Sequence, residues 1–234
     1  MSQTAAERIE RTIAVGILRG DYPIGTTLPS VRKLAEQFET TVPTIQRAVD
    51  RLAASKLVSV RRGSGITVND PQGTGDLSIM PLWFEAFQDD PDRLGRMFSD
   101  FLEMRRVIAA HLIRTRLPSL MMAAPALAAV ATSLATATTI EEIAVADSRL
   151  TRVFVDAADN FAISSVFSAI ERFSLEVPQA AEALYGDRES HRKIIGEVVA
   201  GLMANDPATA VTNALENWDR RTVARFLALV KPAS

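Results

Sequence analysis

The apolar residues of this chain recur mostly at helical spacing, beginning with three segments near the N-terminus. Residues 4–18 place their large aliphatic side chains mostly on one side of a helix, which the turn-forming residues 20–25 end. Residues 30–38 predict a shorter helix that begins after Pro29. After a break at residues 39–42, a third helix runs to about Ala54, because its apolar positions follow an i, i+3, i+4, i+7 spacing: Ile45, Ala48, Val49 and Leu52.

The pattern then changes to alternation and returns to helix. Residues 57–60 alternate as a strand, residues 61–65 form a tight tip, and residues 66–68 return as a second strand. Helical patterns fill the chain from residue 77, with breaks near residues 89–91, 117–118, 159–160, 185–186 and 205–207. We therefore predict a mainly α fold. It consists of an N-terminal winged helix-turn-helix with a small β-hairpin wing (1–70), a linker (71–76) and an all-α helical bundle (77–234).

The order of helix, helix, turn, helix and hairpin is typical of a winged helix-turn-helix. In that fold the third helix lies in the major groove, where base edges differ in their donors and acceptors. The predicted hairpin tip carries Arg61 and Arg62 before Gly63. Arginines can pair with phosphates, and glycine lets the backbone approach DNA closely. The pattern predicts that the first 70 residues bind double-stranded DNA.

Charge and composition add to this division. Residues 1–70 hold 10 Lys and Arg against 7 Asp and Glu, whereas residues 71–234 hold 16 against 21. A mildly basic head on an acidic body indicates that the head meets the polyanion. The chain has no Cys, its N-terminus has no apolar core of signal-peptide type, and the uncharged residues 117–140 are mostly Ala, Thr and Ser. We expect a cytoplasmic protein without a membrane span, in which residues 117–140 form a buried, Ala-rich helix.

The N-terminal residues resemble those of GntR-family transcription regulators. The resemblance rests on residues 21–35, on residues 41–49 and on the wing residues 62–68. It implies that Arg32 contacts phosphate or base, that Thr41 and Thr44 hydrogen-bond DNA at the start of the recognition helix, and that Arg62 and Gly63 lie at the wing. Gln46 and Val42 stand where family members often have Arg. Because Gln prefers adenine, the family resemblance does not predict the operator sequence of this chain. An ordinary solvated helix face is the alternative for Arg32 and Arg47.

The helical part resembles the FCD subgroup of that family, which includes the fatty-acid regulators (FadR). Residues 102–108, 146–151 and 206–217 carry this resemblance. Many FCD domains bind a divalent metal through one Asp and three His, but here Thr151 and Asn217 stand where two of the His are expected, and Asp147 remains. We expect no metal and no other cofactor. The remaining histidines are interpreted as a helix-surface residue, His191, and a part-buried residue, His111. A metal-dependent regulator of small organic acid metabolism remains the alternative.

The resemblance also implies an effector cavity in the bundle. The predicted effector-binding residues are Arg105, Asp147, Thr151 and Asn217, with walls from Val107, Ile108, Leu150, Phe154 and Phe167. The Arg105 guanidinium could pair with an anionic group, because it matches carboxylate and phosphate geometry. A surface salt bridge with Asp100 or Glu103 is the alternative for this arginine. We expect a small anionic effector with an apolar part, and an acyl-CoA or fatty-acid-derived ligand is one candidate.

The sequence favours a regulator over an enzyme. It shows no nucleophile motif, no paired His and no phosphate-binding loop, and its adjacent acids, such as Glu141 and Glu142, are typical of a solvated surface. We therefore predict no catalytic residues. We expect a homodimer that binds an inverted-repeat operator, since two-fold symmetry spreads two recognition helices over two half-sites. The segment 77–87, with Trp83 and Phe84, is a candidate dimer contact.

Overall fold

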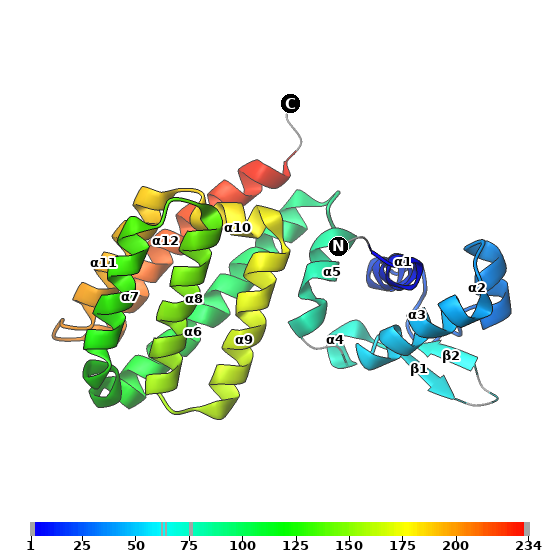
Figure 1. The fold of residues 1–234 in the computed structure, drawn as a ribbon, viewed down its shortest axis with the longest axis horizontal. Helices are drawn as coiled ribbons and strands as arrows, with labels where there is room; N and C mark the ends of the chain where they lie inside the picture. Colours follow the sequence, from blue (N-terminus) through cyan, green and yellow to red (C-terminus); the bar gives the residue numbers. More distant parts are fainter. Residues whose placement is uncertain (1–2, 62, 64, 75–76, 232–234) are drawn as a thin grey trace. The chain divides into compact units, whose positions relative to one another are not determined.

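The chain divides into two compact units, Met1–Gln88 and Asp89–Ser234 (Figure 1). The computed structural model describes residues 3–61, 63, 65–74 and 77–231. The sequence-based division fell at residues 71–76, twelve or more residues earlier than the boundary in the structure. The difference has a packing cause, because apolar side chains after this point belong to the core of the N-terminal unit: Ile79, Leu82, Trp83, Ala86 and Phe87.

The first three helices of the N-terminal unit form where the apolar spacing predicts them. They are α1 (Ala5–Arg19), α2 (Val31–Gln37) and α3 (Val42–Ala54). Thr4 begins α1 with a capping box, in which Glu7 is the reciprocal partner. Ser30 caps α2, and Gly20 ends α1 in the left-handed conformation that glycine adopts without strain. The helix ends therefore follow capping chemistry that is visible in the sequence.

The wing is a two-stranded antiparallel hairpin of β1 (Val58–Arg61) and β2 (Gly65–Val68). Its register pairs Val58 with Val68 and Arg61 with Gly65. Residues 25–28 extend this hairpin, since Leu28 N donates to Ile66 O at 2.8 Å. Gly65 has φ +88°, and a Cβ there would stand 2.9 Å from Cγ2 of Thr27. Position 65 therefore requires glycine for both its backbone and its neighbour.

Residues 71–74 of the expected linker are helical. They form the short helix α4 (Pro71–Thr74), and η1 (Leu77–Ile79) and α5 (Met80–Ala86) follow it. The α5 segment is attached to α1, because Arg11 pairs with Glu85 at 2.5 Å and Arg19 Nε donates to the carbonyl of Ala86 at 2.6 Å. Residues 77–87 were expected to offer Trp83 and Phe84 for a dimer contact, but Phe84 is buried and Trp83 is half-buried.

The C-terminal unit is an all-helical bundle, which confirms the mainly α fold. Its elements are α6 (Pro91–Met122), α7 (Ala124–Thr136), α8 (Ile140–Ala157), α9 (Phe161–Glu176), α10 (Pro178–Tyr185), α11 (Arg188–Gly201) and α12 (Pro207–Val230). The helix α12 lies along α6, and α7 packs mainly on α8 (Figure 1). Four of the helices begin at side-chain caps near the predicted breaks: Asp90, Asn160, Asp187 and Asp206.

One predicted break is instead a kink. The helix α6 continues through Pro118, with non-helical torsion angles at Arg116, where φ is −133°. Proline inside a helix removes one backbone hydrogen bond and produces a kink, and the helix continues past it when packing holds the two parts. Among the described residues, no single helix has the length and apolar composition of a membrane span. Only α6 and the first part of α7 taken together have that length and apolar composition, and a bend of 88° separates the two helices.

Candidate functional site

The outer face of α3 carries the residues expected to contact bases. Gln46 and Arg47 are both exposed, and the hydroxyl oxygens of Thr41 and Thr44 lie 2.9 Å apart at the start of the helix. The Gln46 amide donates to Oδ1 of Asp50 at 3.3 Å. This face can therefore donate and accept hydrogen bonds.

Exposed cations also occur in the elements that precede and follow α3 in the sequence. Arg32 is exposed in the first turn of α2, and Lys33 beside it is a second exposed cation, which no motif had marked. Arg61 is exposed at the end of β1, and Gly63 follows with φ +82°. Arg62, also predicted to bind DNA, lies outside the described residues.

These arginines differ from Arg51, which serves packing within the unit. Arg51 of α3 pairs with Glu10 and Glu7 of α1. In contrast, Arg32, Arg47 and Arg61 have no acidic partner in the part of the chain that the structure describes. Their charge is therefore available to a phosphate.

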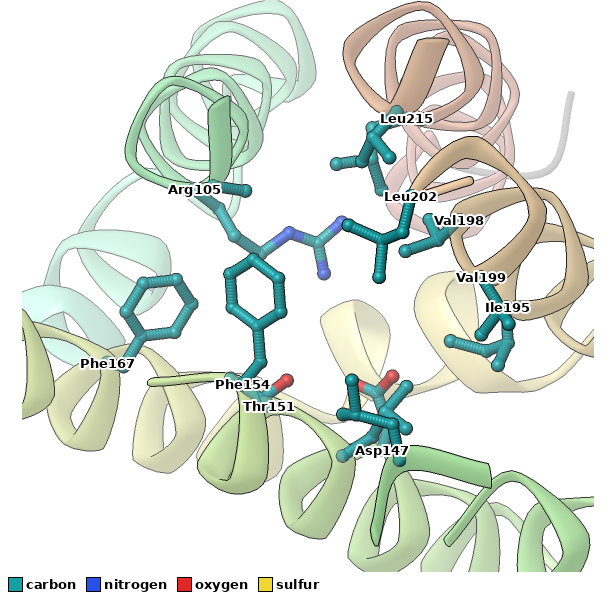
Figure 2. A pocket seen from close by; sticks show the side chains of 14 residues that line it. Arg105, Asp147, Thr151, Phe154, Phe167, Ile195, Val198, Val199, Leu202 and Leu215 are labelled. Carbon is teal, nitrogen blue, oxygen red and sulfur yellow. The ribbon is translucent and has the colours of Figure 1, made fainter. Parts of the chain in front are cut away.

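The C-terminal unit holds a cavity of about 110 Å³. Its walls come from several helices and are chiefly apolar, with Leu127, Leu150, Phe154, Phe167, Ile195, Val198, Leu202, Val211 and Leu215 among them. Three of the four predicted effector-binding residues line it: Arg105, Asp147 and Thr151. Arg105 from α6 and Asp147 from α8 point into the cavity from different walls (Figure 2).

Arg105 shares its counter-ion with the next residue. The Arg106 Nη1 lies 2.6 Å from Oδ2 of Asp219, and Arg105 Nη2 lies 3.4 Å from Oδ1 of the same carboxylate. Arg105 also stacks over the ring of Trp218, 5.1 Å from its centroid. Burial raises the pKa of Asp219, and the two guanidinium groups act against that rise. The surface ion pairs with Asp100 or Glu103 that the sequence left open are not the ones formed.

Two side chains contact the Asp147 carboxylate. The Tyr185 hydroxyl donates to its Oδ2 at 3.3 Å, and Nε2 of His191 lies 3.3 Å from its Oδ1. Burial lowers the pKa of His191, and Asp147 acts against that effect. Burial, followed by the charge of Asp147, raises the pKa of Tyr185 well above its usual value. Both side chains are therefore uncharged at neutral pH.

A smaller cavity of about 30 Å³ adjoins the first. It shares Arg105, Asp147 and Thr151 with the larger cavity and is lined by more polar groups, including Ser148 and Glu171. The Ser148 hydroxyl donates to the Glu171 carboxylate. The site therefore has an apolar part and a polar part that meet at Arg105 and Asp147.

Several sequence-based assignments to this site are wrong. Asn217 is exposed and accepts a hydrogen bond from Arg220 at 2.7 Å, because the buried face of α12 runs through Trp218, Asp219 and Thr222 instead. Val107 is 59% exposed, so it is not a cavity wall.

Ile108 is half-buried and is not among the cavity-lining residues. The inward positions of α6 at this level are Arg105 and Ala109, one turn apart. Leu150, Phe154 and Phe167 do line the cavity, as predicted.

The two histidines lie opposite to expectation. His191 is only 2% exposed, and His111 is exposed. A signal for His191 was present, because it lies at helical spacing from the buried residues Ile194 and Ile195 of α11. Tyr185, Ser148, Glu171 and Asp219 were not assigned, since no local motif marks them. Among the described residues, no group of three His, Asp or Glu side chains is placed to hold a metal ion.

Comparison with known proteins gives the first unit a family. Residues 5–68 match the model of bacterial regulatory proteins of the gntR family. An HTH-type transcriptional regulator of Mycobacterium tuberculosis, Rv0494, is 28% identical over 89% of this chain and 84% of its own length. The regulator Mce2R of the same species is 37% identical over 34% of this chain and 33% of its own length.

A further relative is the fatty acid metabolism regulator protein of Proteus mirabilis, which is 29% identical over 49% of this chain and 46% of its own length. The match thus covers a third of the length of Mce2R, about half of the fatty acid metabolism regulator and most of Rv0494. Residues 5–68 form a helix-turn-helix domain of the gntR family of bacterial regulatory proteins, and the chain that carries it is a DNA-binding transcription regulator.

Proposed function

We propose that this regulator binds an inverted-repeat operator as a homodimer and that a small molecule in the cavity of the C-terminal unit controls the binding. The observation that carries the proposal is a set of exposed cations on the gntR-family domain that have no acidic partner among the described residues: Arg32, Arg47 and Arg61. Such cations neutralise phosphates and release counter-ions, which makes DNA affinity depend on salt. Gln46 and the hydroxyls of Thr41 and Thr44 supply hydrogen bonds for base edges.

Fluorescence anisotropy with duplexes from the chain's own promoter region tests DNA binding. Arg32→Ala or Arg47→Ala is expected to weaken binding to all duplexes and to reduce the slope of log affinity against log salt by about 1. Arg149→Ala, at an exposed position of α8, is the matched control and should leave both unchanged. Gln46→Ala is expected to relax one base preference by about 1–3 kcal/mol. Wild-type protein that binds no promoter duplex at low salt would contradict the proposal.

The homodimer is tested separately. One chain has a mass of 25.4 kDa, so light scattering is expected to give about twice that value at micromolar concentration. A mass near that of one chain would contradict two-fold binding to an inverted repeat.

The effector is proposed to combine an apolar part with an anionic group. The apolar lining of the cavity supports the first feature, and the Arg105 guanidinium supports the second. A fatty-acid-derived effector is the second candidate, and the relative named a fatty acid metabolism regulator favours it. The cavity of about 110 Å³ is smaller than the ~300 Å³ lower bound of most ligand sites, so a long acyl chain requires the helices to separate.

Thermal-shift measurements test the effector. Octanoate, succinate and octanoyl-CoA are added to wild type and to Arg105→Ala, with and without a chelator. A ligand that binds the folded state raises the melting temperature by mass action. Control through this cavity is contradicted if no compound, including the amino acids and their analogues described in the next subsection, raises the melting temperature or changes DNA affinity. A melting temperature that falls with the chelator would favour the metal-dependent alternative.

A further inference from the structure

The cavity carries one cation whose charge is only partly compensated. Arg105 and Arg106 share the single carboxylate of Asp219, and Arg106 holds it at the shorter distance, 2.6 Å against 3.4 Å. Two guanidinium groups and one carboxylate leave one positive charge over. Because Arg105 points into the cavity (Figure 2), that charge is directed at whatever occupies it.

The opposite wall carries an anion without a cation. Asp147 accepts a hydrogen bond from the Tyr185 hydroxyl, and its Oδ1 lies 3.3 Å from Nε2 of His191, which is buried and neutral. No Arg or Lys of the described residues forms an ion pair with Asp147. A carboxylate that is 16% exposed and contacts only neutral side chains is stabilised further by a cation.

These two charges do not neutralise each other by contact. Arg105 and Asp147 are not joined by an ion pair among the described residues, although both line the same two cavities. Figure 2 shows their polar ends directed into the space between the helices. The site therefore presents a positive group and a negative group to one ligand, next to apolar walls.

Resting on the proposed function, we propose that the effector is a compact zwitterion, namely an apolar α-amino acid or a close analogue. Its carboxylate pairs with Arg105, its ammonium pairs with Asp147, and its side chain packs on Leu150, Phe154 and Leu202. The volume supports a compact side chain, because an engineered cavity of ~150 Å³ is known to hold one benzene molecule.

Ligands with a single charge fit this site less well. A simple fatty acid pairs with Arg105 but places its carboxylate near Asp147, where like charges repel. A simple amine pairs with Asp147 and leaves Arg105 with its shared counter-ion. The two charged walls thus discriminate against both classes.

A matched panel of ligands tests this inference on the full-length wild-type protein. Each of L-leucine, L-valine and L-phenylalanine is compared with its deaminated acid and its decarboxylated amine, for example 4-methylpentanoate and 3-methylbutylamine for leucine. At least one amino acid is expected to raise the melting temperature and to bind about 10- to 100-fold more tightly than both of its analogues, because each analogue loses one charge-assisted contact. The inference is overturned if no amino acid outranks its analogues, or if octanoyl-CoA or octanoate binds more tightly.

Two variants separate the charges. Asp147→Asn is expected to reverse the preference, so that 4-methylpentanoate binds more tightly than leucine. Asp156→Asn, at an exposed position of the same helix, is the matched control and should leave the preference unchanged. An unchanged preference in a folded Asp147→Asn variant also overturns the inference, and the wild-type panel decides if that variant does not fold. Promoter binding is measured in parallel, because its loss would refute the proposed function, whereas a failed panel with intact DNA binding refutes only the ligand class.

Discussion

The shared carboxylate of Asp219 leads to a quantitative prediction about its two arginines. The contact with Arg106 is 2.6 Å long, which is a charge-assisted hydrogen bond, whereas the contact with Arg105 is 3.4 Å long, beyond the usual 2.7–2.9 Å for such bonds. Both arginine side chains are about one-fifth exposed, so solvent screens them in part. We expect a coupling free energy of about 2 kcal/mol for Arg106 with Asp219 and below about 1 kcal/mol for Arg105 with Asp219.

Double-mutant cycles measure these two coupling energies. Alanine is introduced at Arg105, Arg106 and Asp219 singly and in the two pairs, and the free energy of unfolding is measured in urea. A Trp83→Phe background leaves Trp218 as the single tryptophan, so the fluorescence reports on the C-terminal unit. Asp219→Ala alone is expected to cost about 3 kcal/mol, because it leaves two half-buried cations without their counter-ion.

A solvent-exposed ion pair serves as the control cycle. Lys193 and Glu197 lie one turn apart at 3.9 Å, and such pairs contribute about 0.3–0.5 kcal/mol. The reasoning is refuted if Arg105 couples to Asp219 as strongly as Arg106 does. In that case Arg105 is already fully paired, and it has no charge to offer a ligand.

Three other perturbations have expected outcomes. Gly65→Ala is expected to destabilise the wing by about 1–3 kcal/mol, since φ is +88° and the new Cβ would meet Thr27; a fall in both melting temperature and DNA affinity would be observed. The pKa of His191 is lowered in the folded state, so the unfolded chain takes up a proton at this side chain more readily, and the free energy of unfolding is expected to fall as the pH drops through about 6.5. In urea titrations His191→Gln should flatten this pH dependence, whereas His111→Gln, at an exposed position, should not. Phe98→Ala is expected to cost about 3–5 kcal/mol in the same unfolding assay, because Phe98 is fully buried among other aromatic rings; a cost below 1 kcal/mol would contradict the packing.

Local signals in the sequence were sufficient for the helices and hairpin of the N-terminal unit. Ser30 and Thr4 cap their helices, Gly20 ends α1, and the spacing of Ile45 and Leu52 places the buried face of α3. These features depend on neighbours within a few residues, so a pattern can show them. The attachment of α5 to α1 through Arg11 depends on Glu85, far along the chain, and no local pattern reveals it.

The cavity was only partly predictable for the same reason. Arg105, Asp147 and Thr151 were assigned through a family resemblance and do line one cavity. Asn217 was assigned in the same way but lies on the outer face of α12, because Trp218 sets which side of that helix is buried. The partners of Arg105 and Asp147 come from other helices, and such pairings are decided by packing in three dimensions.

The length of α6 has a mechanical consequence for a regulator of this kind. From Pro91 to Arg105 the helix rises by about 21 Å, and its kink at Arg116 lies beyond that stretch. Gln88 ends the N-terminal unit, and Asp90 caps α6 by accepting from the backbone N–H of Arg93 at 3.0 Å. Proline at position 91 fixes one further torsion angle. An axial rotation of α6 at Arg105 is therefore carried along an unbroken helix to its cap at Asp90, two residues beyond the end of the N-terminal unit.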